Sequence, residues 1–399
     1  MADSRDAITT SASITSTGER NSAAFSRNLG IDFLRGLAIL LVVVHHLGLR
    51  FPLKKTLLLD FLPKRLCSAI NYNGYEAVFV FFVISGFLIT SNCLQRWGQL
   101  SAIDWRAFYT RRAARILPSL TVLVAVLSVL HLAHLPFYTI DGEQQSLTGA
   151  IASAFGLYLN WYEGQYGYLP GGWDVLWSLS IEEVFYLAFP LLCLLFTRRA
   201  FLIIALTALT LSLPYTKMAL TGNDIWQEKA YLPGMSAIAL GVLSALFAQS
   251  ALRWSPVLRR RMTSLFFIVG SVGLITVLYY SDVWWGLMRE FYMLPLIFSA
   301  AALVLACYWR NLDGHLTLPR GLNWLCRMGQ LSYEIYLVHM FVVFAIVHYA
   351  PQLSDNRAWY FLWYVPAVLG SWLLGYLLAR FVSLPSERWI KLKRLSSRA

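Results

Sequence analysis

The chain has 399 residues, of which 58% are hydrophobic and only 14% charged, and its formal net charge is +12. Soluble domains carry about a quarter of charged residues, so this composition excludes an ordinary water-soluble protein. The basic balance does not indicate nucleic-acid binding, because Lys and Arg gather at the ends of apolar stretches, where they set membrane topology.

Ten apolar stretches predict membrane-spanning helices, so the expected fold class is an all-α polytopic membrane bundle. They are residues 31–49, 77–94, 113–132, 176–196, 200–213, 232–249, 264–280, 291–309, 331–349 and 360–381. The bundle forms one membrane domain over residues 29–383, between a disordered tail at residues 1–28 and a short basic tail at residues 384–399. A further apolar stretch, 147–159, is short for a span, and we expect it to be re-entrant or interfacial.

The basic residues predict that both tails lie in the cytoplasm. With ten spans, the Arg-rich connections fall on the cytoplasmic side, and residues 133–175, which contain no Lys or Arg, fall outside. One connection departs from this rule and places five basic residues outside. These residues either face an anionic acceptor or lipid headgroups, or are an exception to the rule: Arg50, Lys54, Lys55, Lys64 and Arg65.

The first span carries Arg35 and His46, eleven residues apart. Eleven residues make three helical turns with about 20° left over, so both side chains share one face, about 16 Å apart along the axis. Ionisable residues in a membrane helix are costly and usually line a pathway or a reaction site. A hydrogen bond to another helix is the simpler alternative, but Asp32 on the same helix favours chemistry. His45 points about 100° away and is expected to lie off this face.

The third span begins with Arg112 and Arg115, which project together as an i,i+3 pair. Paired guanidinium groups suit phosphate, through forked charge-assisted hydrogen bonds. Anchoring of the helix at the cytoplasmic surface is the alternative. It explains Arg115 less well, because this residue lies a turn further into the helix.

The fourth span opens with Trp177, Ser178, Glu182 and Glu183. Adjacent carboxylates facing lipid would be costly, so we expect one to face a polar cavity and the other to be interfacial. Ser178 shares the face of Glu182 at i,i+4 spacing. The aromatic residues near this entrance form either an interfacial belt, which is the simpler interpretation, or a stacking surface for sugar rings.

The ninth span contains Tyr336 and His339 at i,i+3 spacing in an otherwise apolar helix. His339 either faces the same cavity or forms a packing hydrogen bond. Absent motifs narrow the chemistry further: there is no P-loop lysine motif, no G-x-S-x-G elbow and no H-E-x-x-H zinc helix. The five cysteines form no C-x-x-C pair, so we expect neither a disulfide framework nor a metal site.

Taken together in chain order, these segments resemble the acyltransferase-3 family of membrane O-acyltransferases. The matching segments are Asp32-Phe-Leu-Arg-Gly-Leu-Ala, Phe81-Phe-Val-Ile-Ser-Gly-Phe, Arg112-Ala-Ala-Arg-Ile-Leu-Pro, Trp177-Ser-Leu-Ser-Ile-Glu-Glu and Leu331-Ser-Tyr-Glu-Ile-Tyr-Leu-Val-His. The resemblance implies about ten helices in the bacterial cytoplasmic membrane. It implies cytoplasmic acyl-CoA, in particular acetyl-CoA, as donor, and an extracytoplasmic carbohydrate such as O-antigen or exopolysaccharide as acceptor, either free or lipid-linked.

The resemblance also assigns roles to residues. It makes Arg112 and Arg115 the binding groups for the phosphates of CoA, with Arg35 beside the donor arm. It makes His46 a general base or a transient acyl carrier. The acid of the family matches Glu182, which would orient His46 or hold the acceptor. The remaining acceptor-binding candidates are Trp177, Ser178, Glu183, Tyr336 and His339.

One departure from the family pattern concerns the start of the second span. Many members have Gly-Val-Asp where this chain has Ala77, Val78 and Phe79, so an acidic role is lost there or has passed to Glu76. Some members carry a further C-terminal hydrolase-like domain, and we expect this chain to act without one or with a separate polysaccharide-assembly partner.

A second function class uses the same residue types. A proton-coupled exporter or flippase of glycans would employ Arg, His and Glu as a relay within the membrane. Paired half-repeats with broken helices would favour it. The chain shows no clear internal repeat, and the R-x-x-R segment suits CoA better, so an acyltransferase is the preferred interpretation.

Overall fold

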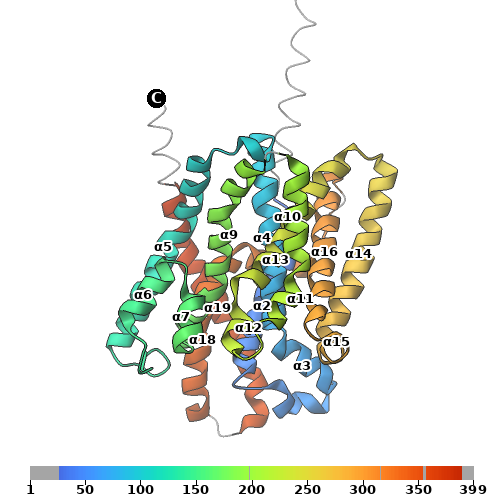
Figure 1. Cartoon of the computed structure of the whole chain (residues 1–399). Coiled ribbons are helices and arrows are strands. Elements are labelled where there is room, and N and C mark those ends of the chain that lie inside the picture. The colour runs from blue at the N-terminus through green and yellow to red at the C-terminus, as the bar shows by residue number, and fades with distance from the viewer. Residues whose placement is uncertain (1–26, 197, 315, 354–355, 389–399) are drawn as a thin grey trace, which may run out of the picture.

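The computed structural model describes residues 27–388, apart from residues 197, 315, 354 and 355. Within these residues the chain forms helices and no strand. Figure 1 shows the long helices packed side by side in one bundle. Nine helical segments of the described chain are long and apolar enough to cross a membrane. The predicted all-α polytopic fold is therefore confirmed. Nearly all of the expected N-terminal tail and most of the C-terminal tail lie outside the described residues.

The helices of the described chain follow one another in a single sequence of elements. They are α2 (Leu29–Gly48), α3 (Lys64–Tyr72), α4 (Gly74–Trp97), α5 (Trp105–Leu132), α6 (Leu147–Phe155), α7 (Leu159–Tyr166), α8 (Gly171–Asp174), α9 (Leu176–Leu195), α10 (Arg199–Leu211), α11 (Leu213–Met218), α12 (Asp224–Lys229), α13 (Tyr231–Ser250), α14 (Pro256–Tyr279), α15 (Ser281–Met288), α16 (Met293–Leu312), α17 (Asn323–Gln330), α18 (Ser332–Leu353) and α19 (Tyr364–Leu378).

The fifth expected span, residues 200–213, is shorter than the others. It corresponds to α10, which has 13 residues and covers only about 20 Å. The chain continues after Ser212 into α11, which begins with Leu213 and has Pro214 in its first turn. Proline fits a first turn because it lacks the N–H that would otherwise be left unpaired there. Together the two helices reach about 30 Å, the thickness of the hydrocarbon core.

The apolar stretch at residues 147–159 does not form a spanning helix. Its main element, α6, has nine residues, and α7 begins directly after the turn that follows. Both lie beside the end of α5 that Figure 1 shows at the lower left. The direction of the helices alternates in Figure 1, so the connection between α5 and α9 lies at the end opposite to the Arg-rich connections. Which end faces the cytoplasm stays a prediction from the positive-inside rule.

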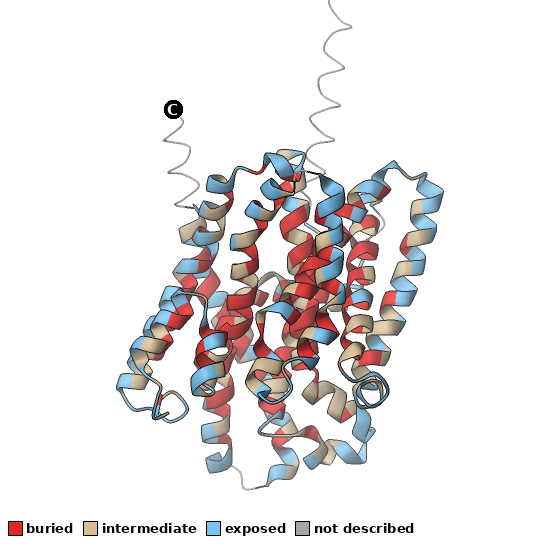
Figure 2. Ribbon diagram, viewed as in Figure 1, coloured by how far each residue is buried: buried red, intermediate tan, exposed pale blue. Residues whose placement is uncertain are grey.

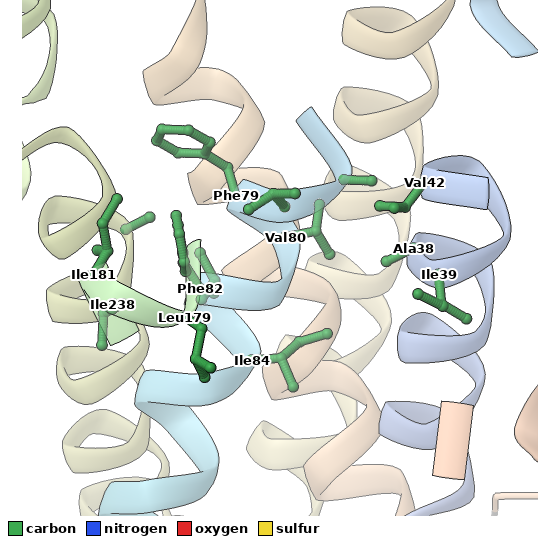
Figure 3. Packing of buried hydrophobic residues seen from close by; sticks show 14 of the residues in the cluster. Ala38, Ile39, Val42, Phe79, Val80, Phe82, Ile84, Leu179, Ile181 and Ile238 are labelled. Atoms are coloured by element: carbon green, nitrogen blue, oxygen red, sulfur yellow. The ribbon is translucent and has the colours of Figure 1, made fainter. Parts of the chain in front are cut away.

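The core lies along α2, α4, α9 and α13, in the centre of the bundle (Figure 2). Figure 3 shows Ala38 and Val42 of α2 pointing toward Val80 of α4, and Leu179 of α9 beside Phe82. The outer helix α14 differs from these, because only 17% of its apolar segment is buried inside the protein. Such an apolar but exposed helix is suited to contact lipid.

Two glycines bring α2 and α17 into close contact. A Cβ atom at Gly36 would overlap the backbone carbonyl of Leu325, and one at Gly329 would overlap the carbonyl of Asp32. Small residues permit this approach between membrane helices, where van der Waals packing replaces the hydrophobic effect. α18 follows directly after α17, so this contact brings the first turn of α18 next to Arg35.

Candidate active site

A cavity lies between α2, α4, α5, α9 and α18, and it brings together most of the polar residues singled out in the sequence. Its lining on α4 extends from Val78 to Asn92, which corresponds to about 21 Å of helix. The hydrocarbon core of a bilayer is about 30 Å thick, so the cavity covers most of that depth. Asn92 is close to the Arg-rich end of the bundle, and Val78 lies towards the opposite end.

Glu182 and Glu183 both line this cavity. From the sequence we expected one of them to be interfacial, and the structure does not place either residue there. The Arg112 guanidinium donates to Oε1 of Glu183 over 2.7 Å, and it lies 3.8 Å from the centre of the Tyr186 ring. The Tyr186 hydroxyl donates to Oε1 of Glu182 over 2.6 Å, and Ser85 donates to the same oxygen. Both carboxylates lie in the cavity because neighbouring helices supply their partners: α5 provides a cation, and α4 and α9 provide hydroxyl groups at this depth.

Arg35 is held at the cavity wall by α18 and by its own helix. Its Nη2 donates to the Ser332 hydroxyl over 2.8 Å, and Nη1 lies 3.9 Å from Asp32. Asp32 also accepts from Arg27 over 2.7 Å and from Gln330 over 3.3 Å. The Asp32 carboxylate is therefore shared by two cations, and it neutralises Arg35 only in part.

Arg115 lines the cavity one turn further into α5 than Arg112 and is exposed. It forms no ion pair with any residue that the structure describes. Arg112 has its charge balanced by Glu183, whereas Arg115 does not. The uncompensated positive charge of the cavity wall therefore lies at Arg115 and, in part, at Arg35.

The far end of the cavity is formed by Ser178 and Tyr336. The Ser178 hydroxyl donates to the Tyr336 hydroxyl over 2.7 Å, which joins α9 to α18. His46 and His339 do not line the cavity. They lie behind Tyr336, whose backbone oxygen is 2.7 Å from Nδ1 of His339. The cavity therefore contains Arg35 but ends at Ser178 and Tyr336, before it reaches His46.

His46 contacts His339 and not Glu182. The ring centroids of the two histidines are 4.9 Å apart. Among the residues described here, the Glu182 carboxylate is bonded to Ser85 and Tyr186. The expectation that Glu182 orients His46 is therefore not met, because Tyr186 lies one turn from Glu182 on the same helix and holds it. His45 faces away, as expected from its rotation, and contacts the carbonyl of Asn71 over 2.8 Å.

Two further residues lie away from the cavity. Trp177 is only 8% exposed and packs between Tyr75 and Phe82, so its ring belongs to the core and not to an open surface for sugars. Glu76, in the first turn of α4, is buried and accepts from the Tyr292 hydroxyl over 2.9 Å. It does not replace the missing acid of the Gly-Val-Asp pattern at the cavity.

Sequence reasoning missed several cavity residues, among them Ser85, Tyr186 and Ser332. Ser85 is a hydroxyl in the middle of an apolar span, which is a weak signal. Tyr186 follows Glu182 at i,i+4 spacing, so helical periodicity could have placed it on the same face. No group of three or more His, Cys, Asp or Glu suited to a metal ion occurs in the described part of the chain.

A second charged cluster lies between α7, α8 and α12, away from the cavity. Nζ of Lys229 donates to Glu163 over 2.8 Å and also to Asp174, and it lies over the Tyr168 ring. Burial raises the pKa of Glu163 well above its usual range, and the neighbouring Asp174 adds to this. The segment at residues 133–175 lacks Lys and Arg, and α12 supplies the cation that pairs with its Glu163 and Asp174.

Of the five basic residues that the sequence places outside, Arg50 lies next to His46. Arg50 donates to the backbone oxygen of His46 over 3.1 Å and lies over the Phe344 ring. Lys54 lies over the Tyr72 ring, and Arg65 pairs with Asp282 over 3.3 Å. Three of these five basic side chains therefore contact other residues of the protein.

Comparison with known proteins agrees with the family resemblance found in the sequence. Residues 28–376 match the model of a family described as an acyltransferase domain. Peptidoglycan O-acetyltransferase OatA of Listeria monocytogenes is 23% identical over 90% of this chain and 55% of its own length. The putative peptidoglycan O-acetyltransferase YrhL of Bacillus subtilis is 27% identical over 79% of this chain and 48% of its own length.

A putative O-acetyltransferase of Staphylococcus aureus is 28% identical over 55% of this chain and 30% of its own length. The chain spans about half the length of the first two relatives and less of the third. No solved structure is significantly similar to it.

Proposed function

The chain belongs to the acyltransferase-3 family, and from that premise we propose that it transfers an acetyl group from acetyl-CoA to a hydroxyl of a carbohydrate. The donor enters from the cytoplasm, and the acceptor lies outside the cytoplasmic membrane of a bacterium. The observation that carries this proposal is the cavity, which extends about 21 Å along α4 and is lined by Arg35, Arg112 and Arg115. The names of the relatives support a glycan such as peptidoglycan as acceptor.

The arginines suit the donor because CoA carries phosphates at one end and the thioester at the other. Guanidinium groups bind phosphate through two parallel charge-assisted hydrogen bonds. Arg115 is the group for this role, because it is exposed in the cavity and has no acidic partner among the described residues. Arg112 already holds Glu183, so its main contribution is to keep this carboxylate in place.

The chemistry requires a base at the acceptor hydroxyl, and His46 is the candidate. His46 takes the hydroxyl proton while the acceptor oxygen attacks the thioester carbonyl. The new C–O bond forms, the C–S bond breaks, and the proton passes from His46 to the leaving thiolate. Because Tyr336 separates His46 from the cavity, the Ser178–Tyr336 hydrogen bond opens when the thioester reaches the histidine.

The test uses purified protein with labelled acetyl-CoA and peptidoglycan fragments. His46→Ala should lower transfer about a hundred- to ten-thousand-fold, the usual contribution of a general base. His45→Ala is the matched control, because its ring bonds to the Asn71 carbonyl and lies off the face shared by Arg35 and His46. An active His46→Ala enzyme, at wild-type expression, would exclude His46 as the base. Glycan movement without any turnover of acetyl-CoA would favour the exporter instead.

A further inference from the structure

Two histidines from distant parts of the chain meet behind the cavity. Nε2 of His339 lies 3.3 Å from Nδ1 of His46, and the two ring planes are inclined by 64°. His339 is completely buried, whereas His46 is half-buried. The hydrogen-bond partners of the four ring nitrogens determine where the protons lie.

The proton of His339 is fixed by the backbone. Its Nδ1 lies 2.7 Å from the carbonyl oxygen of Tyr336. A carbonyl oxygen can only accept, so Nδ1 must carry the hydrogen. The neutral ring has one N–H, and Nε2 of His339 therefore presents its lone pair to His46.

The same reasoning determines which ring nitrogen of His46 carries the hydrogen. Its Nδ1 lies 2.9 Å from the carbonyl oxygen of Val42 and faces the lone pair of His339. Both neighbours accept, so Nδ1 of His46 carries the hydrogen and shares it between them. The opposite arrangement would require a charged, fully buried His339 and would bring two lone pairs together at Val42. Nε2 of His46 is thus left unprotonated, and it forms no hydrogen bond within the described chain.

We propose that His339 is a positioning residue that holds His46 as the tautomer with a free Nε2. This inference rests on the proposed function, in which His46 is the base. When Nε2 of His46 takes a proton from the acceptor, the hydrogen bond from its Nδ1–H to Nε2 of His339 becomes stronger. An orienting partner of this kind is typical of histidine bases, which must present the correct nitrogen. The cavity carboxylates cannot supply it, because Tyr186 and Arg112 hold them.

Two substitutions separate the two ring nitrogens of His339. In His339→Gln the side-chain oxygen reaches the position of Nε2 and can accept from His46. In His339→Asn the shorter amide reaches the position of Nδ1, so it can bond to Tyr336 but not to His46. Asn is therefore the matched control for the loss of one contact, and His339→Leu removes both contacts while keeping the volume.

The first measurement is steady-state transfer with each variant. We expect His339→Gln to stay within about tenfold of wild-type kcat, and Asn and Leu to lose about ten- to a hundredfold. The KM for acetyl-CoA should not change, because His339 does not line the donor cavity. Equal kcat for Asn and wild type, or a folded Gln variant as slow as Leu, would overturn the inference.

The second measurement does not depend on activity. Nitrogen-15 spectra of histidine-labelled protein distinguish protonated from unprotonated ring nitrogens, and His46→Gln identifies the His46 signals. The expected result is an unprotonated Nε2 in the wild type and in His339→Gln, and a mixture of tautomers in His339→Asn. A protonated Nε2 in the wild type would refute the positioning role. An active His46→Ala enzyme with the expected spectra would instead refute the proposed base.

Discussion

Arg112 and Arg115 are one turn apart on α5, yet the structure predicts opposite consequences of replacing them. Arg112 donates to Glu183, whose side chain is 11% exposed. Arg112→Gln therefore leaves a buried carboxylate without its cation, and breaking such a pair costs about 3–5 kcal/mol. Arg115 is exposed in the cavity and unpaired within the described chain, so Arg115→Gln should leave the stability unchanged.

The effect on donor binding is expected in the reverse order. Arg115→Gln removes a charge-assisted contact to phosphate, worth about 1.5–3 kcal/mol, and should weaken the affinity for acetyl-CoA about ten- to a hundredfold. The assay combines calorimetric titration with CoA and thermal unfolding in detergent. Arg106→Gln on the same helix is the control, because Arg106 is exposed and lies outside the cavity.

A double variant tests the reason for the stability loss. Arg112→Gln combined with Glu183→Gln removes both charges and should regain part of the stability lost in the single variant. An unchanged CoA affinity in Arg115→Gln would instead support the alternative interpretation, in which this residue anchors the helix at the cytoplasmic surface. An Arg112→Gln protein as stable as the wild type would show that Glu183 does not depend on its cation.

Two further predictions concern the charged cluster at Lys229 and the topology. Lys229→Met should lower the unfolding temperature at neutral pH, because Glu163 and Asp174 lose their cation. The loss should shrink on acidification, since the pKa of Glu163 is raised and its protonated form needs no cation; a loss that grows at low pH would contradict this. Single cysteines at Gln144 and Arg260 should be labelled from opposite sides of the membrane, Gln144 from outside. Labelling of both from the same side would exclude the ten-span arrangement.

The fold was largely predictable from the sequence, because hydrophobic length determines the spans of a membrane protein. The break between α10 and α11 was less visible, since Pro214 lies at the end of an apolar stretch. Helical periodicity correctly placed Ser178 and Glu182 on one face, and both line the cavity. Their roles stay predictions.

Contacts between helices were beyond the sequence. Periodicity could relate Arg35 to His46 on α2, but it could not show that Tyr336 of α18 stands between the cavity and the histidine. It also could not show that Arg112 of α5 would form an ion pair with Glu183 of α9. Side chains from different spans meet only through packing, and single-helix patterns carry no information about register between helices.

The hydrogen bond between Ser178 and Tyr336 also has an electrical consequence. In the proposed orientation, water in the cavity extends the cytoplasmic potential about 21 Å into a hydrocarbon layer of about 30 Å. Most of the transmembrane voltage then falls across the thin layer that contains Tyr336 and the two histidines. Moving one elementary charge through the full voltage changes its energy by about 2.3 kcal/mol per 100 mV. A proton that crosses this layer during turnover would therefore make the rate of transfer depend on the membrane potential.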